Sequence, residues 1–317
     1  MGGEARVRVL VVGAGAVGQA FGVALHLSGW RVTWLVKPAH VAGLQAGLRL
    51  HALSMLRGPR TVEVSSPQLV TDPASVDVDL TLWAVPSPVL RTAWLPAFLE
   101  AQGHVPAVLL QPGFDEVERV LSLRPDLSIT QGLISLIAYA TPLPGEEGRF
   151  AAPGTAVWAP TLLPSPLCGR DAEPVARALH AGGLPARAVA SLGSTSALGS
   201  AATGALMASL EVAGWRFDQL EPHQAAQAID EALSVVEASG GLSRPAPLRL
   251  LGAPTLRIAR RVVQSRFVPL DMQTYLKVHF TKVGAQTRQH LDDLLVSAGE
   301  CGIDVPQLQV LRGQLDG

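Results

Sequence analysis

Apolar and polar residues alternate over the N-terminal 190 residues as in a chain of strands and helices that follow one another. A short apolar run at residues 7–12 precedes a glycine-rich turn, a helical segment at 17–28 and a second strand-like run at 31–36. Further strand-like runs lie at residues 80–85, 105–110, 127–138 and 186–190, with helical stretches between several of them. Strands that alternate with helices predict an α/β fold, in which a doubly wound parallel sheet carries helices on both faces.

Two segments interrupt this alternation. Residues 48–64 leave no room for a helix and predict a hairpin that turns near Arg57-Gly58-Pro59. The proline-rich residues 141–166 predict loops and short strands at the far edge of the sheet.

After Gly193 the pattern changes to helical periodicity alone. The expected helices span residues 194–217, 223–239, 246–264, 271–299 and 306–315, and Pro254 is expected to kink the third of them. We therefore expect two domains, an α/β domain at residues 1–190 and an all-helical domain at residues 191–317.

The turn after the first apolar run reads Gly13-Ala14-Gly15-Ala16-Val17-Gly18. In a Rossmann unit the first glycine permits the tight turn, the second lets the backbone approach a pyrophosphate, and the third lets the helix pack closely on the strand. The strand, turn, helix and second strand fill the ~30 residues expected of such a unit, which makes the motif more specific than the glycines alone. The sequence therefore predicts a dinucleotide held by Gly13, Gly15, Ala16, Val17 and Gly18.

The residue that follows the second strand-like run distinguishes between dinucleotides. An NAD or FAD site usually has Asp or Glu there, whereas this chain has Lys37, one of only three lysines. A cation at this place suits the 2′-phosphate of NADP(H), so we expect NADP(H) rather than NAD(H). His40 and Arg49 lie nearby in the sequence and are interpreted as exposed loop residues.

Composition excludes several classes of protein. With 317 residues, of which 48% are hydrophobic and 16% charged, the chain is too apolar for a disordered protein. A net charge of -1 without a basic patch argues against nucleic acid, and no apolar run approaches the ~20 residues of a membrane-spanning helix. Cys168 and Cys301 have neither a disulfide pattern nor a metal-binding spacing. We expect a soluble cytoplasmic protein whose partner is a small-molecule substrate, and a homodimer is the oligomer considered.

The order of these motifs resembles the ketopantoate reductase family over most of the chain. The matching features are the glycine turn, Lys37 in Val-Thr-Trp-Leu-Val-Lys-Pro-Ala-His, Gly47-Leu-Arg-Leu, the strand from Asp79 to Val85, Leu110-Gln-Pro-Gly113 and Gly302-Ile-Asp-Val-Pro306. The resemblance implies an N-terminal Rossmann domain, a helical C-terminal domain and NADPH-dependent reduction. The further contacts that we expect are Val85, Pro86, Gln111 and Pro112 to the cofactor, and Ser196, Ser200, Gly204 and Thr274 to the substrate.

At several of these positions the chain departs from the family. The family usually has a lysine after the strand, where Pro86 stands, and Gln-Asn-Gly at the later turn, where this chain has Gln111-Pro112-Gly113. By spacing, the family's proton-donating lysine, its two asparagines and its glutamate fall on Ser196, Ser200, Gly204 and Gln286. Ordinary ketopantoate reduction is therefore not expected.

A polar stripe on the predicted helix at residues 271–299 offers replacements. Tyr275, His279, Lys282 and Gln286 are spaced by four, three and four residues, so they share one helix face, and His290 continues the row. Because Gln286 matches a family position that faces the cleft between the domains, we expect the stripe to line that cleft. Lys282 or His279 would then donate a proton to the substrate. The other interpretation is a solvated helix face that carries these residues by chance.

The first C-terminal helix, at residues 194–217, is rich in Gly, Ala, Ser and Thr and has no charge before Glu211. Together with Trp83, Trp158, Trp215 and Phe267 it favours a larger or less polar substrate, although such a helix also suits a tight helix crossing. We predict an NADPH-dependent oxidoreductase that reduces a C=O or C=N bond with altered catalytic residues. The alternatives are a catalytically silent dinucleotide-binding protein that senses or scaffolds, and a true ketopantoate reductase with relocated catalytic groups.

Overall fold

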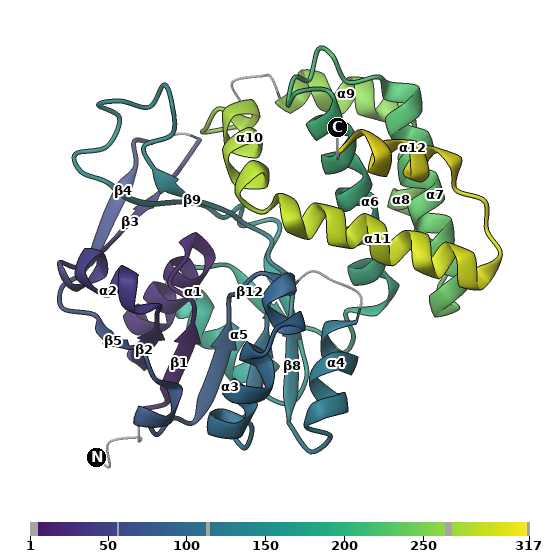
Figure 1. Cartoon of the computed structure of the whole chain (residues 1–317). Coiled ribbons are helices and arrows are strands. Elements are labelled where there is room, and N and C mark those ends of the chain that lie inside the picture. Colours follow the sequence, from purple (N-terminus) through teal and green to yellow (C-terminus); the bar gives the residue numbers. More distant parts are fainter. Residues whose placement is uncertain (1–5, 56, 112–114, 264–267, 316–317) are drawn as a thin grey trace. The chain divides into compact units, whose positions relative to one another are not determined.

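The computed structural model describes residues 6–55, 57–111, 115–263 and 268–315, with the backbone alone for residues 193–196, 247, 260, 262 and 263. The chain divides into two compact units. The first consists of Met1–Gln111 with Asp115–Leu192, and the second of Pro112–Phe114 with Gly193–Gly317. Within the described ranges, the first unit contains sheets and helices and the second contains helices alone (Figure 1).

The first unit is built on an eight-stranded sheet with the strand order β12-β11-β8-β7-β6-β1-β2-β5. Its strands are β1 Arg8–Val12, β2 Arg31–Leu35, β5 Gln68–Val70, β6 Leu80–Trp83, β7 Ala107–Leu109, β8 Ile129–Gly132, β11 Ser165–Cys168 and β12 Ala186–Ala188. Neighbouring strands are parallel except for β11, which is antiparallel to β8. The predicted α/β class with a mostly parallel sheet is confirmed.

Helices cover both faces of this sheet. The helices and short 3-10 turns of the unit are α1 Ala16–Leu27, α2 Pro38–Gln45, η1 Pro73–Ser75, η2 Ser87–Arg91, α3 Trp94–Gln102, α4 Glu116–Leu123 and α5 Ala172–Ala181. Val9 and Val11 of β1 share a core with α1 and α5, whereas Leu10 and Val12 share another with α3 and α4. Each of these four side chains contributes roughly 1.5–3 kcal/mol by burial. A strand buried on both faces explains why β1 is an uninterrupted apolar run.

A second, four-stranded sheet belongs to the same unit, in the order β4-β3-β10-β9. Its strands are β3 Leu48–Ala52, β4 Arg60–Val64, β9 Ile137–Thr141 and β10 Gly154–Trp158. The predicted hairpin is confirmed, because β3 and β4 pair in antiparallel register. The prediction of one strand at residues 127–138 is wrong: β8 joins the large sheet and β9 the small one. An apolar run does not reveal where the chain leaves one sheet for another.

The prediction that residues 141–166 lie at the far edge of the sheet is also wrong. Strand β10 is an inner strand of the small sheet, and β11 lies between β12 and β8 in the large one. Turn residues mark where a chain bends, whereas the place of a strand in a sheet depends on tertiary contacts.

The second unit is a bundle of helices around its own core. The helices are α6 Gly193–Val212, α7 Pro222–Gly240, α8 Ala246–Arg249, α9 Ala253–Val263, α10 Met272–Lys282, α11 Gly284–Cys301 and α12 Pro306–Gln314. Ala205 of α6, Leu233 of α7, Leu291 of α11 and Leu308 of α12 are each 0% exposed and belong to one cluster. Among the described residues, no helix has both the length and the apolar character needed to cross a membrane.

The prediction of one kinked helix at residues 246–264 is wrong, because the segment forms the separate helices α8 and α9. Pro254 is the second residue of α9. A proline fits the first turn of a helix, since the N–H that it lacks has no partner there. Pro254 therefore starts a helix instead of kinking one.

Candidate functional site

The turn between β1 and α1 requires glycine at two places. Gly13 has a φ of +95°, which residues with a Cβ rarely adopt, and a Cβ there would meet the Ala84 carbonyl oxygen at 3.1 Å. A Cβ on Gly18 would lie 1.9 Å from the Gly13 carbonyl oxygen. The start of α1 thus packs directly on the turn.

Gly15 differs from these two glycines. It is the N-cap of α1 with an ordinary extended backbone, and nothing lies within 4 Å of a Cβ built on it. No described side chain caps the first turn of α1, so the N–H groups of Ala16 and Val17 remain available to an anion. The open space beside Gly15 and these N–H groups make the turn able to receive a phosphate.

Strand pairing brings several predicted cofactor contacts to one edge of the large sheet. Val12 pairs in parallel with Leu35 of β2 and with Trp83 of β6. The glycine turn and Lys37 therefore follow neighbouring strands, which lie about 4.8 Å apart. Lys37 is exposed and stands at the N-cap of α2. The order of strands reverses at β1, and open α/β sheets bind their ligands at such a point.

Gln111 supports the same edge from the end of β7. Its Nε2 donates to the carbonyl oxygens of Trp83, at 3.2 Å, and of Val85, at 3.0 Å. These bonds hold the loop that follows β6, in which Pro86 is the N-cap of η2. Pro112 lies outside the described residues.

Three of the residues expected to contact substrate, Ser196, Ser200 and Gly204, lie on α6. Ser200 is half-buried, and a Cβ on Gly204 would meet the His290 ring of α11 at 3.4 Å. The side chain of Ser196 is not among those described. Gly204 of α6 thus faces the His290 ring of α11 at a distance that a methyl group would fill.

Thr274, another predicted substrate residue, belongs to the cap of α10. Its Oγ1 donates to Asp271 Oδ2 at 2.7 Å, while Asp271 Oδ1 accepts from the N–H groups of Gln273 and Thr274. These bonds satisfy N–H groups at the start of the helix.

The aromatic residues of α10 surround His279. Its ring stacks on Tyr275 at 5.4 Å between centroids and meets the edge of Phe280 at 5.0 Å. Burial, and after it the charge of Lys282, lowers the pKa of His279 below its ordinary value. Burial also raises the pKa of Tyr275 to about 12. Lys282 itself is exposed at the last residue of α10. The group combines a neutral imidazole, a phenol and a nearby cation.

The prediction of one helix over residues 271–299 is wrong. At Val283, with φ −107° and ψ 21°, the chain leaves helical geometry, and α10 and α11 run in different directions (Figure 1). Tyr275, His279 and Lys282 lie on α10, whereas Gln286 and His290 lie on α11. Helical spacing therefore does not place all five side chains on one face.

Weak helix formers and a charged anchor explain this break. Val283 is β-branched and Gly284 has a low helix propensity. Arg288 folds back onto the start of α11, where its Nη1 donates to the Gly284 carbonyl oxygen at 3.2 Å. Its Nη2 donates to Glu211 Oε1 and to the Leu315 carbonyl oxygen, at 3.0 and 2.7 Å. The start of α11 is thus fixed to α6 and to the end of α12.

Sequence reasoning did not single out Glu116, the first residue of α4. Its side chain is 6% exposed, and burial raises its pKa against a smaller opposing effect of the Ser87 hydroxyl. Asp115 beside it binds Arg91 and Arg119 at 2.9 and 2.7 Å. An Asp-Glu pair at the start of a helix is usually solvated, so the pattern carries no signal that one of the two is buried.

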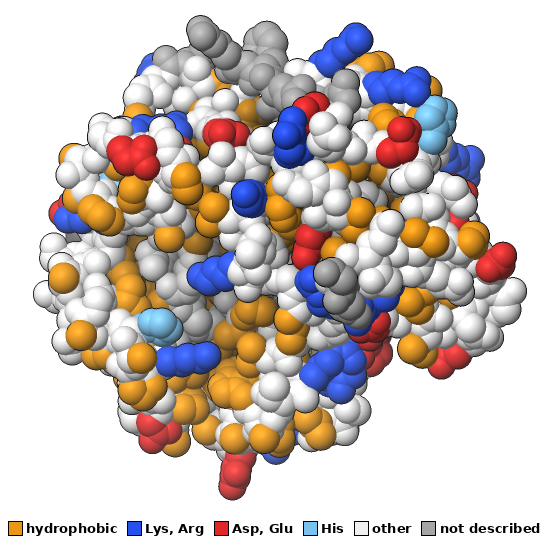
Figure 2. Space-filling model, turned by 45° about the horizontal axis from the view of Figure 1, so that its top comes forward, with side chains coloured by type: hydrophobic (Ala, Val, Ile, Leu, Met, Phe, Trp, Pro, Cys, Tyr) orange, Lys and Arg blue, Asp and Glu red, His pale blue; other side chains and the backbone are white. Residues whose placement is uncertain are grey.

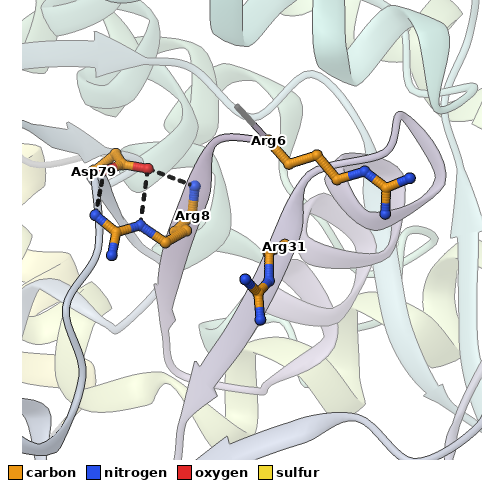
Figure 3. A pocket seen from close by; sticks show the side chains of 4 residues that line it. All are labelled: Arg6, Arg8, Arg31 and Asp79. Atoms are coloured by element: carbon orange, nitrogen blue, oxygen red, sulfur yellow. Dashed lines mark hydrogen bonds and ion pairs between the residues drawn. The ribbon is translucent and has the colours of Figure 1, made fainter. Parts of the chain in front are cut away.

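A hollow at the opposite edge of the sheet is lined by Arg6, Arg8, Arg31 and Asp79 (Figure 3). Two side-chain nitrogens and the backbone N–H of Arg8 donate to Asp79 at 2.6 to 3.2 Å. These residues stand at the amino ends of β1, β2 and β6, away from the glycine turn. On the face seen in Figure 2, basic side chains lie among acidic and apolar ones without a continuous basic patch. Among the described residues, no group of three His, Cys, Asp or Glu could hold a metal ion.

A family comparison agrees with the motifs. Residues 9–158 match the family model described as "Ketopantoate reductase PanE/ApbA". The resemblance inferred from the sequence is thereby confirmed. No curated protein sequence matches the chain.

Solved structures of similar fold cover nearly the whole chain. A PanE/ApbA family ketopantoate reductase from Ralstonia eutropha JMP134 is 19% identical with a TM-score of 0.71, over 98% of this chain and 97% of that one. A 2-dehydropantoate 2-reductase from Methylococcus capsulatus is 17% identical with a TM-score of 0.68, over 98% and 96%. D-mandelate dehydrogenase, in a ternary structure with NADH and anilino(oxo)acetate, is 16% identical with a TM-score of 0.66, over 98% and 97%. At these identities the similarity shows a shared fold.

Proposed function

We propose that this chain, of which residues 9–158 match the ketopantoate reductase PanE/ApbA family model, belongs to that family and is a cytoplasmic NADPH-dependent oxidoreductase. It would reduce a C=O or C=N bond of a small, rather apolar substrate. The observation that carries the proposal is the glycine turn beside Lys37 at the carboxyl ends of two paired strands. Residues 1–190 would hold the cofactor, and residues 191–317 would supply the substrate and catalytic groups. A homodimer stays the oligomer considered.

The residues at the sheet edge fit NADP(H). The open space at Gly15 and the N–H groups at the start of α1 suit a pyrophosphate, and the exposed Lys37 suits a 2′-phosphate. Val85, Pro86, Gln111 and Pro112 follow the next two strands and would contact the nicotinamide half. When bound, the cofactor supplies the hydride.

The α10 group suggests how a proton is supplied. Because its pKa is lowered, His279 is neutral at pH 7 and would form a hydrogen bond to the substrate rather than act as the proton donor. Lys282 is then the donor for reduction, and Tyr275 positions His279 through their stacked rings. Gln286, at the start of α11, would bind a polar group of the substrate.

A catalytically silent dinucleotide-binding protein is the second candidate. Two observations favour it: Gly204 faces the His290 ring of α11, and Thr274 is hydrogen-bonded within the cap of α10. Neither residue is thereby available as a dedicated substrate ligand. A true ketopantoate reductase with relocated catalytic groups is the third candidate.

A substrate screen separates the three candidates. NADPH oxidation is followed by absorbance with ketopantoate, with the 2-oxo acid whose reduction gives mandelate, and with less polar ketones and cyclic imines. The proposal predicts turnover of a less polar substrate and none of ketopantoate, because Ser196, Ser200 and Gly204 replace the family's Lys and Asn groups. Turnover of ketopantoate at the ~1–10³ s⁻¹ usual for enzymes would contradict it. NADPH binding without oxidation by any compound would favour the silent protein.

A further inference from the structure

The side chain of Gln19 connects the glycine turn to the small sheet. Gln19 lies in the first turn of α1, and its Nε2 donates to the Ala14 carbonyl oxygen at 2.9 Å. Its Oε1 accepts from the Thr155 hydroxyl of β10 at 2.7 Å. The amide of Gln19 thus contacts Thr155, which lies 136 positions later in the sequence.

The Thr155 end of this connection is firmly held. Thr155 is 2% exposed and lies inside β10, which pairs with β3 on one side and β9 on the other. The Ala14 carbonyl oxygen can only accept, so it keeps the Nε2 end of the amide toward itself, and the buried Thr155 hydroxyl then holds the Oε1 end. The small sheet, which the sequence did not predict, therefore holds the side chain of Gln19 in place.

The Ala14 end determines where a peptide N–H points. In a trans peptide the carbonyl and the following N–H point in opposite directions. Because the Ala14 carbonyl is bound to Gln19, the N–H of Gly15 points away from Gln19. Gly15 is exposed, with nothing within 4 Å of its Cβ position.

We propose that Gln19, oriented by Thr155, is a positioning residue for the cofactor: it holds the Ala14–Gly15 peptide with its N–H toward the pyrophosphate. This proposal rests on the proposed NADPH-binding function. A held peptide needs no reorganisation when the ligand binds, which improves affinity.

Four variants test the connection. Gln19→Leu removes both hydrogen bonds, Thr155→Val removes the hydroxyl at nearly constant volume, and Thr155→Ser keeps it. Gln102→Leu is the control, because Gln102 is a glutamine of the same unit whose side chain likewise donates to backbone carbonyl oxygens, those of Pro73 and Val76. Its bonds lie at the amino edge of the sheet, before β6.

Two measurements are made on each variant. NADPH and adenosine 2′-monophosphate, which lacks the pyrophosphate, are titrated by calorimetry. Loss of one or two hydrogen bonds should weaken NADPH about 3- to 10-fold in Gln19→Leu and less in Thr155→Val, while adenosine 2′-monophosphate is unchanged. Amide hydrogen exchange of the unliganded proteins should accelerate at residues 13–18 in Gln19→Leu and in Thr155→Val. In Gln102→Leu it should accelerate at residues 72–79 instead.

The outcomes are distinguishable. Failure of the wild type to bind NADPH overturns the proposed function and this proposal with it. NADPH binding by the wild type that is unchanged in Gln19→Leu, or weakened equally in Gln102→Leu, overturns only the role of Gln19. Wild-type NADPH affinity in Thr155→Ser supports the coupling of the two side chains, and so does a double variant, Gln19→Leu with Thr155→Val, that binds NADPH no more weakly than Gln19→Leu.

Discussion

His290 is a buried imidazole of the helical unit, 9% exposed, and burial lowers its pKa to about 4. Its folded pKa is thus below the ordinary value of about 6.5. As the pH falls from about 6.5 to 4, the unfolded chain takes up a proton that the folded chain does not. The free energy of unfolding should therefore fall over this range by about 3 kcal/mol from this residue alone.

Urea unfolding at pH 7.5 and pH 4.5 measures this contribution in wild type and in His290→Leu. The variant should lose less stability between the two pH values than the wild type. Glu116 has the opposite sign, because its raised pKa favours the folded state at low pH, and it contributes equally to both proteins. An identical pH dependence in the two proteins would show that the pKa of His290 is the same in the folded and the unfolded state.

Alanine variants of the two lysines of α10 test whether Lys282 is the proton donor. Lys277 and Lys282 are both exposed on this helix, but only Lys282 lies close enough to affect the pKa of His279. Loss of a positioned proton donor should lower kcat by about 10²–10⁴-fold in Lys282→Ala, with the NADPH affinity unchanged. Lys277→Ala should keep wild-type turnover. Equal kcat values for the two variants on the true substrate would remove Lys282 from the mechanism.

The turn from β1 into α1 makes opposite predictions for two glycines. Gly18→Ala places a Cβ 1.9 Å from the Gly13 carbonyl oxygen, so the helix must shift, at a cost of about 1–3 kcal/mol. Gly15→Ala meets nothing in the protein and should leave the melting temperature nearly unchanged. Because its Cβ would occupy the space proposed for the pyrophosphate, NADPH affinity should nevertheless fall about tenfold or more.

Thermal unfolding and NADPH titration of both variants separate these effects. Destabilisation by Gly15→Ala would show that the space beside it is not open. Normal NADPH affinity in a stable Gly15→Ala protein would place the pyrophosphate elsewhere.

Sequence patterns predicted the elements whose signals are local. The Rossmann start was readable because three glycines, an apolar strand and a helix occur within one short segment, and each has its own steric reason. The break at Val283 could not be predicted from the sequence. Arg288 fixes the start of α11 through Glu211 and Leu315, which are distant in the sequence. The small sheet was missed for the same reason, since β10 pairs with β3 across about a hundred residues.

In the whole molecule, as we propose it, the glycine turn and Lys37 together bind NADPH. The most direct test titrates NADPH and NADH into wild type, Lys37→Ala and the control Arg31→Ala, which removes a cation from the opposite end of β2. A charge-assisted hydrogen bond is worth roughly 1.5–3 kcal/mol, so Lys37→Ala should weaken NADPH about 10- to 100-fold and leave NADH nearly unchanged. Arg31→Ala should bind both as the wild type does. Equal losses for both dinucleotides in Lys37→Ala, or tighter binding of NADH than of NADPH by the wild type, would show that Lys37 does not bind the 2′-phosphate of NADPH.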